Sequence, residues 1–435
     1  MFSRLVLAST FVCWRAFISL LVPLVVASSA HAAPPELDRP ATVKRFVALI
    51  KAALPAATIT VDGEEVRVAQ AEGQPSGVAT LGPTLDDMAQ LSTDLERETR
   101  LANVAARLVT SLSSKDEPTD WASAQRKLVP IVRSDLSFSI DESMVATQES
   151  GAQVVRFPRI RWAGELAIGF ALDRPDAVLR VEQRVFAAWK KSERDLLPIA
   201  VKNLRKIVPK PFARHGDGFF VASNGDTLDA GRVLLVDEIR ALGMKSAPLA
   251  ILSTRDLLVL VPEGDPELVA QALAFADKNR TGGRVIHAPV LRLAKAGWEV
   301  FAPSGTSATD AAIQRYNLLA KLRLHAEQKE HLDPQSEDIF VASLNAYQIS
   351  GRAVEAAVLG AELTTLLPRA DIVALVRHDK DGGEPKMIGY VDFTKLLEVA
   401  GAKAKPLGMS PERWRVEMAL TPAELEALAP RERPL

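Results

Sequence analysis

The sequence predicts an α+β protein built from two or three mixed modules with antiparallel or mixed sheets. Helical and strand periodicities follow one another without the strict strand-helix-strand rhythm of a parallel sheet. The chain has 435 residues, more than one hydrophobic core usually serves. Hydrophobic residues make up 48% of the chain, which is ample for burial and argues against disorder.

The N-terminal segment 1–32 has the composition of a secretory signal peptide. Its only charges are Arg4 and Arg15, and an apolar run extends from Phe17 to Ala27. This run is shorter than the roughly 20 apolar residues that cross a bilayer, but it fits the apolar core of a leader. Small residues follow, so we expect cleavage between Ala32 and Ala33 and a periplasmic or secreted protein.

The alternative for this segment is an uncleaved membrane anchor, because Leu5 to Trp14 is also fairly apolar. Arg15 would then lie at the centre of the spanning helix, where a charge is costly. Cys13 lacks the small preceding residue expected before a lipidated cysteine. We therefore favour cleavage.

Composition excludes several classes of function. Without the two arginines of the leader, the chain carries 51 Lys+Arg against 54 Asp+Glu, so no global field attracts nucleic acid, and membrane contact is at most peripheral. Cys13 is the only cysteine, so the mature chain has no disulfide, thiolate zinc site or cysteine nucleophile. We expect no metal and no cofactor.

The first predicted module spans residues 40–150. Its expected elements are a helix at 41–54, strands at 58–61 and 65–69, a loop at 73–82, and helices at 85–112 and 121–133. The second module spans 151–300 and contains a predicted hairpin in which Leu166 to Leu172 turns back at 173–176 into Val178 to Val181.

Further elements of the second module follow from the same periodicities. We expect a helix at 185–206 that Pro198 kinks or splits, a helix at 229–242 that Gly243 ends, and strands at 219–222, 249–252 and 257–261. A linker at 302–307 opens the third module, 307–435. This module is expected to contain a helix at 308–330 and strands at 339–342, 372–377 and 386–393.

A shift of 120 residues aligns the segment 220–250 with 340–370. The shift matches Phe220-Val221-Ala222-Ser223 with Phe340-Val341-Ala342-Ser343, and Gly231-Arg232 with Gly351-Arg352. We interpret this as an internal duplication of a strand-helix-strand unit. The alternative is a coincidence between two ordinary units.

The hairpin, the segment Ala200-Val201-Lys202-Asn203-Leu204, the strand 219–223 and Ser253-Thr254-Arg255-Asp256-Leu257-Leu258 together resemble the YtpQ family. The resemblance covers about residues 40–300. This family comprises bacterial proteins of unknown function, so the resemblance implies no catalytic residues. The leader and the segment 301–435 depart from the family pattern and suggest adaptation to an exported role.

Short segments offer few candidates for chemistry. His325 and His331 are six residues apart, which places them about 120° apart around a helix and favours a solvated helix end over a zinc site. Asp379 to Glu384 resembles the start of a calcium loop but lacks later ligands, so a hairpin turn is the better interpretation. No nucleophile elbow, phosphate loop or dinucleotide motif is present.

Two candidate binding features remain. The first is a basic patch formed by Lys190, Lys191, Arg194, Lys202, Arg205 and Lys206, for which the alternative is the solvated face of an amphipathic helix. The second is the pair Arg255 and Asp256, which could present charges at an inter-strand turn or form a surface ion pair.

The leading functional hypothesis is an exported, non-enzymatic binding or adaptor protein for a protein or envelope partner. The alternative is a hydrolase whose carboxylates lie in a cleft between modules, since such pairs leave no local motif. A deep acidic pocket would favour the enzyme, and a shallow groove beside an exposed sheet edge would favour binding.

Cleavage of the leader is directly testable. We expect the intact mass of the protein purified from its native envelope to match a chain that begins at Ala33, because signal peptidase cuts behind small residues. Retention of Met1 in that mass, or recovery of the protein in the cytosolic fraction, would show that the segment is not a cleaved leader.

Overall fold

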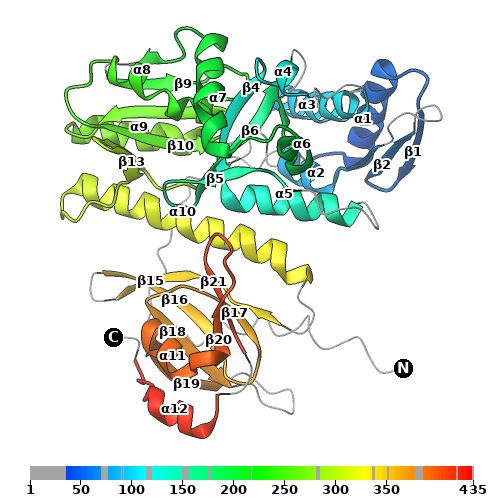
Figure 1. Ribbon diagram of the computed structural model, residues 1–435. Helices are drawn as coiled ribbons and strands as arrows, with labels where there is room; N and C mark the ends of the chain where they lie inside the picture. The colour runs from blue at the N-terminus through cyan, green and yellow to red at the C-terminus, as the bar shows by residue number, and fades with distance from the viewer. Residues whose placement is uncertain are drawn as a thin grey trace, which may run out of the picture.

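The computed structural model describes residues 36–69, 77–89, 91, 93–113, 120–148, 156–174, 178–216, 218–280, 285–335, 339–349, 352–377, 386–417 and 420–433. The leader therefore lies outside the described residues. The fold is α+β, with several antiparallel and mixed sheets, as the sequence predicts. Three bodies follow one another along the chain, and a long helix lies between the second and the third (Figure 1).

The N-terminal body is a small antiparallel sheet covered by helices. Its elements are α1 (Arg39–Ala53), β1 (Thr58–Asp62), β2 (Glu65–Ala69), β3 (Gly77–Thr80), α2 (Gly82–Ala89) and α3 (Asp94–Ser113). Phe46 and Ile50 of α1 are fully buried and pack with Val66 and Val68 of β2. The expected loop at 73–82 contains β3, and the single helix expected at 85–112 is divided into α2 and α3.

The central body contains two sheets that share one core. Its first half comprises α4 (Trp121–Ala124), β4 (Leu128–Ser134), α5 (Asp135–Gln148), β5 (Arg159–Arg161), β6 (Leu166–Asp173), β7 (Val178–Arg180), α6 (Gln183–Ala188) and α7 (Glu193–Ile207). The predicted hairpin of β6 and β7 is confirmed. Val132 and Ile168 of this sheet pack against Ala250 and Leu258 of the second sheet.

The second half of the central body is a six-stranded antiparallel sheet ordered β13-β12-β10-β11-β9-β8. Its elements are β8 (Ala213–His215), β9 (Phe219–Ala222), η2 (Asp229–Leu234), α8 (Val236–Arg240), β10 (Pro248–Thr254), β11 (Leu257–Pro262), α9 (Pro266–Lys278), β12 (Leu291–Ala294) and β13 (Gly297–Val300). β8 lies at one end of the sheet and has three exposed residues.

The prediction of a helix at 121–133 is wrong beyond the first turn. Residues of β4 form a strand in which every position is buried, and β4 pairs along its length with β6. The β-branched residues Val129, Ile131 and Val132 favour this extended backbone. Pro130 is tolerated because β4 is an edge strand, where a missing N–H need not break a ladder. The expected boundary at 150/151 therefore separates two strands of one sheet.

The C-terminal body combines two four-stranded sheets, ordered β15-β16-β18-β19 and β14-β17-β21-β20. Its elements are β14 (Phe340–Val341), β15 (Asn345–Ile349), β16 (Arg352–Gly360), β17 (Thr365–Pro368), β18 (Ile372–Arg377), β19 (Lys386–Asp392), α11 (Phe393–Ala400), η4 (Gly401–Lys403), β20 (Ala404–Pro406), β21 (Arg413–Val416) and α12 (Pro422–Leu428). The two sheets and α11 enclose one apolar core.

The structure contradicts the internal duplication. The segment 231–242 forms η2 and α8, whereas the aligned residues of the second copy form strand β16. Val354 and Ala356 pack into one cluster, and Ala357 and Leu359 pack into another, so side chains of β16 face both sides of the sheet. Pairing with β15 and β18 decides the conformation here, and the shared residues reflect coincidence.

α10 (Ala308–Leu332) joins the central and C-terminal bodies, and η3 (Asp333–Gln335) follows it (Figure 1). The helix begins at the Ser307 N-cap after the expected linker. Ile313 and Tyr316 in its first half belong to the core of the central body. Its second half carries His325 and Gln328, which are buried against the C-terminal body.

Arg413 of β21 holds α10 to the C-terminal sheet. Its guanidinium is fully buried and donates to the Oε1 atom of Gln328 at 2.6 Å and to the carbonyls of Ala342 and Leu366 at 2.7 and 2.9 Å. Burial lowers the pKa of Arg413 to about 10, which leaves the side chain charged at neutral pH. These hydrogen bonds offset the desolvation of the charge.

We expect Arg413→Leu to destabilise the C-terminal body by about 3 kcal/mol or more, because each buried carbonyl left without a donor costs roughly 1–3 kcal/mol. Arg415→Leu on the same strand is the matched control, since the Arg415 side chain is 44% exposed. Urea unfolding followed by circular dichroism measures the difference. Equal unfolding midpoints for the two variants would contradict this role.

Candidate functional site

The six residues of the predicted basic patch are all exposed in the structure. Lys190 and Lys191 lie in the connection between α6 and α7, and the other four lie on α7. At 100° per residue, Arg194, Lys202 and Arg205 fall within about 80° of one another around the helix. We call these six residues the basic surface.

α7 presents this surface because its opposite side is anchored in the core. Leu196, Ala200 and Leu204 are buried, and the Asn203 side chain donates to the carbonyls of Gln125 and Leu128, both at 2.8 Å. A capping box between Ser192 and Asp195 starts the helix. The helix expected at 185–206 is therefore divided before Ser192, between α6 and α7. It is not divided at Pro198, which lies inside α7.

The cations of the basic surface differ in their surroundings. Arg205 forms ion pairs with Glu238 and, at 3.5 Å, with Asp237. Lys191 lies over the ring of Trp121, 5.2 Å from its centroid. Within the described part of the chain, Arg194, Lys202 and Lys206 have no carboxylate at ion-pair distance, so their charge faces solvent.

A groove lies where the chain continues beyond the end of α7. It has a volume of about 230 Å³ and lies beside the edge strand β8, with Lys210, Arg214 and His215 among its lining residues. The ring of His215 packs against Phe219 and Phe275, with centroid distances of 4.8 and 4.5 Å. Exposed cations therefore extend from α7 to an open sheet edge.

Arg255 and Asp256 form an ion pair with each other, as in the predicted alternative, but the pair is partly buried and does not lie on the open surface. The two side chains pair with each other at 3.1 Å in the turn between β10 and β11. The Arg255 carbonyl accepts a hydrogen bond from the Ala230 backbone N–H at 3.0 Å. This turn anchors the start of η2. It joins two central strands of the six-stranded sheet and is not part of the basic surface.

A second candidate site lies where the central body, α10 and the C-terminal body meet. This junction pocket has a volume of about 400 Å³. Its polar lining residues are Glu165, His287, Gln314, Asn317, Lys321, His325 and Glu355. Glu165 lies in the turn between β5 and β6, Lys321 lies on α10 and Glu355 lies on β16, so all three parts of the structure contribute.

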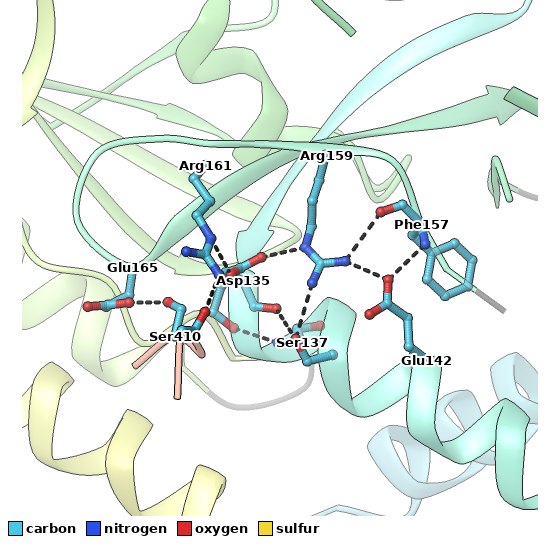
Figure 2. A network of polar contacts seen from close by, with 11 residues as sticks. Asp135, Ser137, Glu142, Phe157, Arg159, Arg161, Glu165 and Ser410 are labelled. Carbon is cyan, nitrogen blue, oxygen red and sulfur yellow. Dashed lines mark hydrogen bonds and ion pairs between the residues drawn. The ribbon is translucent and has the colours of Figure 1, made fainter. Parts of the chain in front are cut away.

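A polar network supports one side of the junction pocket (Figure 2). The buried carboxylate of Asp135 accepts hydrogen bonds from Arg159 and, at 3.1 Å, from Nε of Arg161. Arg161 also donates to the carbonyl of Gly408 at 2.8 Å, and the Ser410 hydroxyl donates to Glu165. The loop before β21 is thereby fixed to the central sheet.

Arg159 of this network also contacts α5 and the chain before β5. Arg159 Nη1 donates to Oε1 of Glu142 at 2.6 Å, and the same oxygen accepts the Phe157 backbone N–H at 2.8 Å (Figure 2). The guanidinium also lies over the ring of Phe138, 5.4 Å from its centroid. A Cβ on Gly169 would stand 2.5 Å from this ring, so the glycine makes room for it.

Two histidines of the pocket lining are held neutral. Burial, together with Arg280 and Arg323, lowers the pKa of His287 to about 4. Burial, together with Arg413 and Lys321, lowers the pKa of His325 to about 3. Neither ring adds positive charge to the junction pocket at neutral pH.

His325 and His331, which the sequence spacing suggested as a possible pair of metal ligands, have different surroundings. His325 is 3% exposed against the C-terminal body, whereas His331 bonds to the Ser143 hydroxyl at 2.9 Å. No three metal-binding side chains gather among the residues that the structure describes. The calcium-like segment 379–384 lies outside the described residues.

The hydrolase alternative requires carboxylates in an inter-module cleft, and the junction pocket contains two. Glu355 forms an ion pair with Lys321 at 2.5 Å, and Glu165 accepts from Ser410. Each of the two carboxylates is therefore already engaged by another side chain of the protein.

No known relative points to a function. No family model matches this chain, no curated protein matches it, and no solved structure matches it. Among the described residues, no helix combines the length and apolar composition that a membrane crossing requires.

The sequence alone does not indicate the junction pocket or its supporting network. Their residues come from distant parts of the chain, so no local spacing brings them together. One signal was available: Arg159 and Arg161 alternate along a short strand, and Asp135 directly follows the apolar run of β4. A charge that ends a buried strand often has a fixed partner nearby.

The buried histidines predict a loss of stability in mild acid. In the unfolded chain both rings bind a proton near pH 6.5, whereas in the folded protein they do so only near pH 4 and pH 3. Their contribution is therefore complete above pH 6.5 and falls as the pH drops. Between pH 7 and pH 5 each should remove about 2 kcal/mol from the free energy of unfolding.

His325→Gln removes one of these titrations, so urea unfolding of this variant should lose about 2 kcal/mol less than wild type between pH 7 and pH 5. His331→Gln is the control, since that ring is only half-buried and its pKa is lowered by partial burial. An equal pH dependence in wild type and His325→Gln would show that His325 is not held neutral.

Proposed function

We propose that the protein is an exported, non-enzymatic binding protein that takes an acidic segment of a partner protein on its basic surface. One observation carries the proposal: unpaired cations follow the exposed face of α7 and lead into a groove beside an open strand. Export is supported by the leader-like composition of residues 1–32. We also propose, on the segments quoted above, that residues 40–300 belong to the YtpQ family.

Charge complementarity decides the chemistry of the partner. A single exposed ion pair contributes only about 0–1 kcal/mol, but a set of cations on one face raises the rate of encounter and rejects basic partners. Arg194, Lys202 and Lys206 keep their charge available for this purpose. The near-neutral balance of the whole chain means that attraction is confined to this face.

The open edge of β8 decides the conformation of the partner segment. β8 is the last strand of its sheet, and an extended peptide can add to such an edge through backbone hydrogen bonds. Lys210 and Arg214 line the groove beside this edge. An extended segment rich in Asp and Glu therefore matches both the edge and the charge.

The same surface fits a membrane less well. A helix that binds in the membrane interface needs its apolar side free to enter the lipid. The apolar side of α7 is packed in the core through Leu196, Ala200 and Leu204. A purely electrostatic contact with anionic headgroups is therefore the competing outcome that the experiment must separate.

Charge reversal tests the proposal. We expect Arg194→Glu/Lys202→Glu/Lys206→Glu to weaken binding of a fluorescein-labelled polyglutamate peptide at least tenfold, because three attractive charges become repulsive. Fluorescence anisotropy at several salt concentrations measures the affinity. The matched control is Lys44→Glu/Lys51→Glu/Lys245→Glu, which makes the same net charge change at exposed positions that do not belong to the basic surface.

Equal affinity of both triple variants would contradict the proposed surface. Tighter binding of wild type to vesicles containing anionic lipid than to the peptide would assign the basic surface to lipid headgroups. The affinity of wild type for the peptide should also fall as salt rises, because exposed charges are screened.

A further inference from the structure

The junction pocket contains one carboxylate without a cationic partner. Glu165 accepts a hydrogen bond from the Ser410 hydroxyl through Oε2. No Lys or Arg among the described residues lies within ion-pair distance of Glu165, although the side chain is half-buried. A half-buried charge with one neutral hydrogen-bond partner is incompletely compensated.

The remaining charges of the lining do not compensate Glu165. Lys321 is the only cation among the pocket's lining residues, and its ammonium group is committed to Glu355 at 2.5 Å. His287 and His325 are neutral at physiological pH. The lining therefore carries a net negative charge, and its uncompensated part lies at Glu165.

The side chain of Asn317 is held in place on the pocket wall by two hydrogen bonds. Its Oδ1 accepts the Val290 N–H at 2.8 Å, and its Nδ2 donates to the Phe301 carbonyl at 2.8 Å. This side chain fixes the wall formed by α10 and the strands beside it.

The walls around these polar groups are apolar. Pro289, Val300, Leu318 and Pro411 line the pocket, and they come from the central body, α10 and the loop before β21. A volume of about 400 Å³ falls in the range of small-molecule sites. Apolar walls with one fixed charge are typical of sites that bind a small amphipathic ion.

We propose that the junction pocket binds a small organic ammonium compound, whose charged nitrogen pairs with Glu165 and whose apolar part packs against Pro289, Leu318 and Pro411. A compound bound there touches the central body, α10 and the C-terminal body together. It therefore stabilises the junction by its binding free energy. This site is separate from the basic surface on α7 and does not depend on it.

Three phenyl compounds of similar size test the charge requirement. The probes are 2-phenylethylammonium, its neutral analogue 2-phenylethanol and the anion 3-phenylpropionate, each titrated into the full-length mature chain up to about 10 mM. We expect the ammonium compound to bind at least tenfold more tightly than the alcohol, and the carboxylate not to bind. Isothermal titration calorimetry measures the affinities.

Glu165→Gln tests the residue. The amide can still accept from Ser410 but has no charge, so we expect the ammonium compound to lose at least tenfold in affinity while the alcohol is unaffected. Glu299→Gln is the control, because Glu299 lies on β13 outside the pocket lining. In ¹H–¹⁵N spectra, the ammonium compound should shift the amide signals of residues 164–165 and 317–325.

Several results would overturn the proposal. They are the absence of binding by the ammonium compound, equal affinity for the carboxylate, equal affinity of Glu165→Gln and Glu299→Gln, and signal shifts confined to residues outside the pocket. Leu318→Phe provides an independent variant, since a larger side chain reduces the volume of the pocket without removing a polar contact. Undiminished binding to Leu318→Phe would place the compound elsewhere.

Discussion

The buried guanidinium of Arg413 is the constraint on which the arrangement of the molecule depends. It cannot remain in the interior without acceptors, and its acceptors belong to three different elements: α10, the end of β14 and β17. Satisfying one side chain therefore fixes a helix against two strands. Because the other half of α10 is packed in the central body, the same helix also positions the central body. The junction pocket is a consequence of this geometry.

The elements that sequence predicts well are those whose pattern and surroundings agree. The helix at 41–54 has its apolar residues on one side and its cap at Asp38, and the hairpin of Leu166 to Val181 alternates in the manner of a strand. The predictions for the segments that form β4 and β16 were wrong for the opposite reason. Their residues are compatible with a helix locally, and pairing with β6, β15 and β18 decides between the two conformations.

The two candidate sites differ in the same way. The basic surface could be predicted because its residues lie in one helix and the connection before it, and helical periodicity places Arg194, Lys202 and Arg205 on one face. The junction pocket could not, because Glu165, Lys321 and Glu355 lie on elements whose proximity arises only from tertiary packing. Likewise, nothing in the local sequence indicates that His325 is buried while His331 reaches Ser143.

The loop before β21 affects the order in which contacts form during synthesis of the chain. The contacts from Ser410 to Glu165 and from Arg161 to Gly408 join positions 245 and 247 residues apart. During synthesis, the central sheet emerges long before its partners, so Arg161, Glu165 and the side chain of Gln328 must first be hydrated by water. A chain that stops short of this loop would keep these groups in solvent, because residues 408–413 supply their hydrogen-bond partners.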